Sequence, residues 1–299
     1  MTNTSPPKML LNKPHTAVGL RNGLQLGLRY GLLLLLTLAA IGPFAWLLST
    51  ALKSSGENIF AYPPRWLPEQ PTLQNFVKVW QSLPMDRYFF NSLGVGFLTV
   101  ALNLGFSVLA AYPLARLRFK GQRLALFLVL ATMMVPFQVI MIPLYLLLLQ
   151  LQLTEGHGLL ASWLGLALPF AVSGFGIFFV RQALLSLPTA LDEAARLDGC
   201  NGLQTLWYVL LPPIRPTLAT LAVFTFMASW GEFLWPSILI SRPENMTLPV
   251  GLVQLQGLFS ADWRLVAAGT IVSIVPVLVF FIALQRYFVQ GVLSGASKE

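Results

Sequence analysis

The stretch EAARLDGCNGLQTLWYVLLP, residues 193–212, begins with a polar run although strongly apolar segments lie on both sides of it. Polar and charged side chains buried in an apolar environment without partners cost free energy. We therefore expect this stretch to face water and to contact a partner there. Its surroundings decide which kind of molecule carries it.

The composition around this stretch is that of an integral membrane protein. Of 299 residues, 56% are hydrophobic and 10% are charged, and the mean hydropathy is +0.71. A transmembrane helix needs about 20 mostly apolar residues, whereas barrel strands give short alternating segments. The long apolar runs predict an all-α membrane protein in a lipid bilayer, with six transmembrane helices at roughly 26–51, 90–114, 124–150, 158–182, 216–240 and 265–289.

Several other classes are disfavoured by residue counts. One cysteine, Cys200, cannot form an internal disulfide, and with two histidines it gives no plausible zinc shell. The formal charge of +8 is interpreted as a sign of membrane orientation, because in a membrane protein the positions of the cations matter more than their sum. We expect no metal site and no nucleic-acid partner.

The distribution of Lys and Arg predicts the orientation. When the loops are assigned to alternating sides, 13 of the 19 cations lie on one side, including four in RLRFKGQR, residues 116–123. Cytoplasmic loops carry this excess. Both termini and the 193–212 stretch are therefore predicted to be cytoplasmic, with tails at 1–25 and 290–299 flanking a six-helix transmembrane domain at 26–289.

The polar stretch itself predicts two short helices. Residues 187–198 carry Pro188 in a position suited to a first helical turn, followed by alanines at helical spacing. Gly199 fits a helix stop with positive φ, and Asn201 fits the cap of a second helix that ends near Pro212. From periodicity alone, an amphipathic helix lying on the lipid surface is an equally open interpretation.

The spacing of Glu193-Ala194-Ala195, Gly199, Val209 and Leu211-Pro212 resembles the EAA loop of membrane subunits of binding-protein-dependent ABC importers. Further stretches at 91–121, 133–153, 229–236 and 285–299 resemble the maltose-type permease subunits of the carbohydrate-uptake family. The resemblance implies the type I ABC importer permease fold, with a cytoplasmic EAA coupling loop at 187–213.

The resemblance also implies roles for the loop residues. Glu193 is the charged contact to an ATPase subunit, Ala194 and Ala195 form a close-packing surface, and Gly199 makes the turn. Val209 stands where isoleucine is more usual, and Leu211-Pro212 ends the second helix. A bulky side chain at Gly199 is expected to strain φ and to push the two docking helices apart.

The partners follow from the same resemblance. The sequence contains no G-x-x-x-x-G-K-[ST] motif, so we expect ATP and Mg²⁺ on two separate ABC ATPase subunits and no cofactor or catalytic activity on this chain. The family pattern adds a second, non-identical permease subunit and an extracytoplasmic solute-binding protein in a bacterial plasma membrane. The expected solute is a sugar or a related oligosaccharide, glycoside, polyol or glycerol phosphate.

Only a few residues are candidates for contacts with the transported solute. Glu232 is an acid within a predicted span, which costs about 2.5–3.5 kcal/mol on insertion scales and often marks a pathway. Its neighbours Trp230 and Trp235 have rings that stack on sugars, and Gln138 lies between two prolines. The alternative is that Glu232 only hydrogen-bonds between helices while the tryptophans pack. Packing is also the preferred interpretation for Asn91 and Asn103.

Two other classes of function compete. A secondary active solute transporter fits the composition, but it would commonly show internal repeats and coupling-ion sites. A membrane-embedded enzyme would need a catalytic constellation, whereas His15 lies in the predicted tail and His157 in a short outer loop.

Overall fold

The computed structural model describes residues 15–257 and 262–296, and within these ranges it is helical without a β-strand. The longer helices are α1 (His15–Leu52), α3 (Met85–Arg116), α4 (Gln122–Thr132), α5 (Phe137–Gln150), α7 (Gly174–Ser186), α10 (Arg215–Trp230) and α13 (Trp263–Ala296). Shorter ones are α2 (Gln74–Ser82), α6 (Leu159–Ala167), α8 (Ala190–Leu197), α9 (Gly202–Gln204), α11 (Leu234–Leu239) and α12 (Leu248–Val253). Single 3₁₀ turns are η1 (Glu155–His157), η2 (Leu168–Phe170), η4 (Pro212–Ile214), η5 (Pro243–Asn245) and η6 (Gln254–Gln256), and η3 (Thr205–Leu210) is a π-helix that continues from α9.

Six spans are present only if three of them are bent. In the described residues, α1, α3 and α13 are continuous, while three helix pairs are bent by 94°, 61° and 46°. The predicted span 124–150 is therefore two helices, α4 and α5, which meet at 94°. Pro136 lies at this break, where proline removes a backbone donor and disfavours helix at the preceding residue.

The other two bent spans differ from the prediction in a similar way. The span 158–182 breaks between η2 and α7, and Ser173 caps α7 by accepting a hydrogen bond from the backbone of Gly176. The span 216–240 ends early, because α10 stops at Trp230 and α11 begins at Leu234. The helix pair at 46° instead joins residues 202–210 to Pro212–Trp230, so α10 continues from the EAA loop.

Both terminal helices extend into the predicted tails. Helix α1 begins at His15, within the predicted tail 1–25, and α13 continues to Ala296. Residues 1–14 and 297–299 lie outside the described part of the chain. The cytoplasmic position of both ends remains a prediction.

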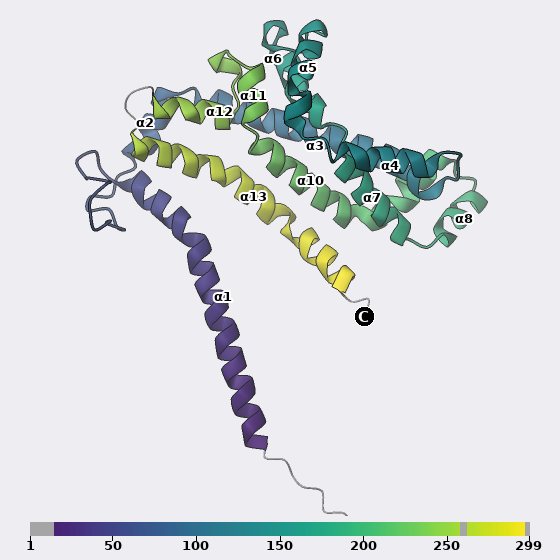
Figure 1. Ribbon diagram of the computed structural model, residues 1–299, viewed down its shortest axis with the longest axis horizontal. Coiled ribbons are helices and arrows are strands. Elements are labelled where there is room, and N and C mark those ends of the chain that lie inside the picture. The colour runs from purple at the N-terminus through teal and green to yellow at the C-terminus, as the bar shows by residue number, and fades with distance from the viewer. Residues whose placement is uncertain (1–14, 258–261, 297–299) are drawn as a thin grey trace, which may run out of the picture.

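Helix α3 connects the two ends of the molecule (Figure 1). Helices α2 and α12 lie at one end and α8 at the other, and α3 packs against α6, α7 and α10 between them. Helix α1 begins away from the bundle and reaches it at its C-terminal end, beside α13 and α2. None of residues 25–48 is buried, and burial begins only at Ser49. Most of this apolar helix thus has no cover from the described chain.

Buried amides tie the helices together where apolar packing alone would not fix their register. The Asn91 amide donates to the carbonyls of Glu244 and Met246, each at 3.0 Å, and Asn103 donates to the carbonyl of Phe170 at 3.0 Å. Both side chains are 2% exposed. Interhelical hydrogen bonds of this kind contribute about 0.6–2 kcal/mol in membranes. Both asparagines thus make the packing hydrogen bonds that were expected of them.

Helix α6 approaches its neighbours through Gly165, and this contact gives a stability prediction. A Cβ at Gly165 would overlap the Leu153 carbonyl and touch Leu239, while a Cβ at Gly105 of α3 meets open space. Gly165→Ala should destabilise the full chain by about 1–3 kcal/mol because the backbone must move, whereas Gly105→Ala should be neutral or slightly stabilising. Thermal unfolding in detergent would compare them; equal midpoints would contradict this packing.

Candidate functional site

The EAA loop folds as the two short helices that its residues predict. Helix α8 covers residues 190–197 and is followed by Asp198 and by Gly199, whose φ is +80°, the left-handed conformation that glycine adopts at low cost. Asn201 then forms a capping box with Gln204. Asn201 Oδ1 accepts from the Gln204 backbone at 2.9 Å, and Gln204 Oε1 accepts from the Asn201 backbone at 2.8 Å.

The first helix presents its polar edge to solvent. Glu193 and Ala194 are exposed, whereas Ala195 is 3% exposed and packs inward, where α8 contacts η3. The expectation that both alanines face a partner therefore needs correction at Ala195. Its small side chain instead lets the two short helices of the loop approach each other.

The second helix is anchored in the core of the bundle. Leu206 and Leu210 are fully buried, Leu211 is 7% exposed, and all three join one cluster with residues of α3, α7 and α10. Val209 and Pro212 are partly buried at its edge. One half of the loop is thus fixed to the transmembrane helices while the other half lies outside them.

Large apolar side chains are exposed on both helices of the loop. Four large side chains there are at least half exposed: Leu197 at 90%, Leu203 at 60%, Trp207 at 58% and Tyr208 at 77%. Together with Glu193 we call them the docking surface. Exposed apolar side chains around a charge are typical of protein–protein contacts.

The helix breaks surround a cavity of about 590 Å³, within the roughly 300–1,000 Å³ that is usual for small-molecule sites. Its wall includes residues from all three interrupted segments: Met133 and Val135, Val172 and Ser173, and Glu232. Non-helical backbone is tolerated at membrane depth where it is buried in protein or lines a water-filled cavity. The helices can therefore break at these positions because the non-helical backbone lines the cavity.

Polar groups form one wall of this cavity and aromatic rings another. Helices α3 and α10 contribute Thr99, Asn103, Thr225 and Ser229, and Glu232 follows α10. The Thr225 hydroxyl contacts Asn103 Oδ1 at 3.4 Å. The aromatic side chains are Phe137, Phe170, Phe175 and Phe224. Such a lining offers hydrogen bonds to hydroxyl groups and flat apolar faces to sugar rings.

The predicted pathway residues are only partly brought together. Glu232 lines the cavity and accepts a hydrogen bond from the Trp235 backbone at 3.1 Å, rather than bridging two helices. Trp230 is 5% exposed and Trp235 is fully buried, and their indoles donate to the carbonyls of Ser273 and Gly165. Packing thus occupies both rings, and stacking on a sugar is not open to them in this structure. Gln138 is exposed and lies outside the cavity wall.

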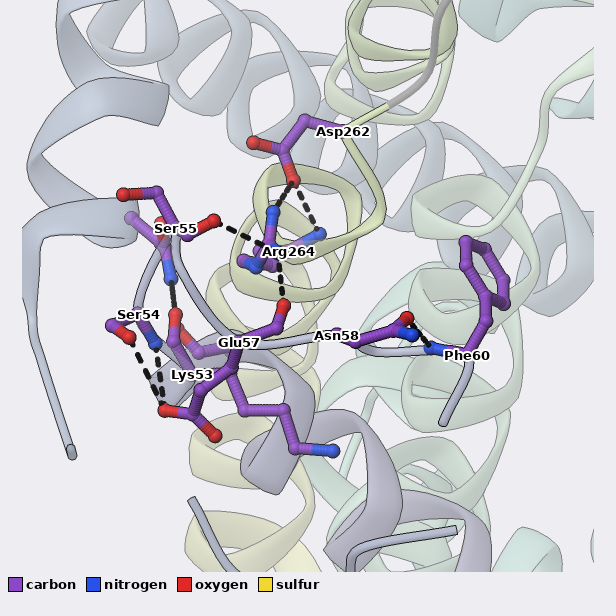
Figure 2. Close-up of polar contacts among 10 residues, drawn as sticks. Lys53, Ser54, Ser55, Glu57, Asn58, Phe60, Asp262 and Arg264 are labelled. Atoms are coloured by element: carbon purple, nitrogen blue, oxygen red, sulfur yellow. Dashed lines mark hydrogen bonds and ion pairs between the residues drawn. The ribbon is translucent and has the colours of Figure 1, made fainter. Parts of the chain in front are cut away.

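At the end of the molecule opposite α8, charged groups order the connection that follows α1 (Figure 2). Arg264 donates to the carbonyls of Glu57 at 2.6 Å and Ser55 at 3.3 Å and pairs with Asp262. The Glu57 carboxylate accepts hydrogen bonds from Ser54, Glu69 and Gln70. Burial opposes its ionisation, but these hydrogen bonds and the Lys53 charge outweigh burial and lower its pKa. The connection is therefore a defined surface.

Comparison with known proteins decides the family. Residues 103–294 match the family of the binding-protein-dependent transport system inner membrane component. The chain belongs to this family. It is thus a permease subunit of an importer in the inner membrane, as the resemblance implied.

Relatives of this permease have carbohydrate-related names. It is 37% identical over 212 residues to the arabinooligosaccharides transport system permease protein AraQ of Bacillus subtilis, covering 71% of this chain and 73% of the relative. It is 34% identical to the sulfoquinovosyl glycerol transport system permease protein SmoH of Agrobacterium fabrum, covering 86% and 88%. A bacterial ABC transporter involved in alginate import has a TM-score of 0.72 at 25% identity, covering 94% of this chain and all of that one.

Sequence reasoning missed most of the cavity wall of this permease. Thr99 and Asn103 are spaced i,i+4 on α3, and Thr225, Ser229 and Glu232 follow at i,i+4 and i,i+7. These spacings place each set on one helical face. A polar stripe in an otherwise apolar span was therefore the available signal.

The open space beside Gly199 refines the expectation for this position. No atom lies within 4 Å of a Cβ built there, so crowding between the docking helices does not follow. The cost is conformational, about 1–2 kcal/mol for a residue other than Gly or Asn in this region. Gly199→Ala and Gly199→Leu, both unbranched at Cβ, should lower the thermal midpoint of the permease alike, and Gly199→Asn should lower it less. A much larger loss for Leu than for Ala would restore the crowding explanation.

Proposed function

We propose that this permease subunit moves a sugar or related solute (an oligosaccharide, glycoside, polyol or glycerol phosphate) into the cytoplasm, driven by ATP hydrolysis on separate subunits. The observation that carries the proposal is the division of the EAA loop. Leu206 and Leu210 on one side of the loop are buried among α3, α7 and α10, while Glu193 and the exposed apolar side chains of both its helices form the docking surface on the other side. A loop built in this way transmits the movement of a docked protein to the bundle. The competing secondary transporter has no counterpart among the relatives described above.

The docked protein is an ABC ATPase, and an assembled importer contains two of them. Glu193 offers a carboxylate that an arginine of the ATPase grips, since charge-assisted pairs of this type are strong and directional. Ala194 allows close approach beside it. ATP and Mg²⁺ belong to those subunits, and this chain acts without catalytic chemistry of its own.

A second, non-identical permease completes the pathway. Helix α1 supports this partner, because its 18-residue apolar core is wholly exposed. The ordered connection at Glu57 and Arg264 supports the third partner, a solute-binding protein on the outer side. With this arrangement both termini and the docking surface are cytoplasmic, in agreement with the excess of cations at residues 116–123.

The cavity lining supports a carbohydrate-type solute. Hydroxyl and amide groups on one wall and aromatic rings on the other suit a molecule with many hydroxyl groups, and Glu232 adds one acceptor. The relatives' names support the same class, although they differ in the sugar. We assign the choice among sugars largely to the binding protein and the second permease.

Glu193→Lys tests the docking role. Reversal of the exposed charge should deplete the ATPase from the complex purified in mild detergent, because a partner arginine would then face a lysine. The second permease should remain, because its contacts lie elsewhere. Quantitative mass spectrometry of the copurified subunits measures both, and Glu69→Lys at the opposite end of the molecule serves as the control.

If ATPase recovery is the same for Glu193→Lys and the native chain, Glu193 is not the contact that matters. If no ATPase is recovered with either, the proposed coupling itself is wrong.

Two threonines of α10 test the cavity. Thr225 lines it, whereas the Thr220 hydroxyl donates to the Pro216 carbonyl at 2.9 Å and is not part of its wall. Thr225→Val and Glu232→Gln should raise the solute concentration for half-maximal uptake several-fold, because a lost hydrogen bond costs about 0.5–1.5 kcal/mol. Thr220→Val should leave uptake unchanged. Equal effects of the two threonine variants on uptake would exclude the cavity as the pathway.

A further inference from the structure

Two adjacent carboxylates of α8 point in opposite directions. Glu193 is exposed on the docking surface, whereas the Asp192 side chain is only 15% exposed. Asp192 Oδ2 lies 3.4 Å from Nε of Arg116, the last residue of α3. One acid of the pair thus faces outward and the other faces the transmembrane bundle.

The Arg116 guanidinium holds the first half of the EAA loop at two points. Besides Asp192, it contacts the Leu187 carbonyl, to which Nη2 donates at 3.0 Å. Leu187 follows α7 directly, and Asp192 lies in the first turn of α8. Arg116 therefore contacts both ends of residues 187–192, the segment that leads into α8.

The ion pair is buried, so its charges depend on each other. The Arg116 side chain is 7% exposed, and neither its Nε nor Asp192 Oδ2 makes a hydrogen bond within the described chain. A buried charge that loses its partner is strongly disfavoured. The two groups are therefore expected to stay together when α8 is displaced.

Besides this ion pair, Leu191 of α8 packs against the buried cluster to which α3 contributes. Helix α8 packs mainly on η3 of its own loop. The end of α3 is also held by Arg181 of α7, whose Nε donates to the Leu114 carbonyl at 3.0 Å. The end of α3 is thus a junction between the docking helix on one side and the helices that line the cavity on the other.

We propose that Arg116 and Asp192 are positioning residues that make α3 move with the docking helix, and so transmit ATPase closure to the cavity. This rests on the proposed function. Helix α3 carries Thr99 and Asn103 on the cavity wall, so a displacement at Arg116 reaches the solute pathway along one continuous helix. The ion pair adds a polar link to the apolar anchoring of the loop, in which Leu191 of α8 packs against the same cluster as Leu206 and Leu210.

The test uses the complete importer reconstituted with its ATPase, second permease and binding protein. Asp192→Asn and Arg116→Gln should leave the ATPase bound, because the docking surface is intact. Solute taken up per ATP hydrolysed should fall roughly three- to thirtyfold, the range for residues that carry coupling between distant sites. Asp192→Glu retains the charge and should restore most of the ratio, and Arg116→Lys only part of it, because lysine lacks the fork that makes both contacts.

The double variant Arg116→Gln/Asp192→Asn separates transmission from folding. It has no unpaired buried charge, so a purely structural pair predicts that uptake recovers to the native ratio, while a transmitting pair predicts that it stays low. Arg118→Gln, an exposed cation two residues away, should keep the native ratio.

Recovery in the double variant, or a loss of uptake that only follows the amount of assembled complex, would overturn the proposal. Failure of the native complex to hydrolyse ATP during uptake would instead count against the proposed function.

Discussion

The whole structure depends on the requirement that backbone N–H and C=O groups be paired wherever water is excluded. Continuous helices meet it within α1, α3 and α13. The other segments break at residues 133–136, 171–173 and 231–233, where some backbone groups lose their helical partners. These three breaks lie on one cavity, whereas the 46° bend between Leu210 and Pro212 lies outside its wall. A cost that would be prohibitive against lipid is acceptable there, because the cavity admits water or a polar solute.

The same requirement for polar groups to be paired or solvated applies at the end of the molecule that carries α8. Charged side chains are either outside, as Glu193 is, or paired within the fold, as Asp192 is with Arg116. This sorting leaves a docking helix with one exposed acid and an apolar surround, and it ties that helix back to α3. Because α3 also forms the polar wall of the cavity, docking and solute passage share one rigid element.

Hydropathy was sufficient for the number of apolar segments but not for their shape. A window of apolar residues cannot distinguish one straight helix from two at 94°, and the prolines predicted interruptions without predicting their angle. Local rules did better: the left-handed Gly199 and the Asn201 cap were predictable because each depends on neighbouring residues only. Long-range contacts were not. The burial of Trp230 and Trp235, the inward turn of Ala195 and the Arg116–Asp192 pair all depend on which helices become neighbours, and periodicity does not contain that information.

The central claim is that ATP on a partner subunit, and not an ion gradient, drives solute through this permease. The most direct measurement is uptake of the radiolabelled sugar that the associated binding protein retains into proteoliposomes containing the assembled importer. We predict uptake that requires both the binding protein outside and ATP on the ATPase side, and that persists when ionophores collapse the proton and sodium gradients. Uptake without ATP that is abolished by those ionophores would contradict the account.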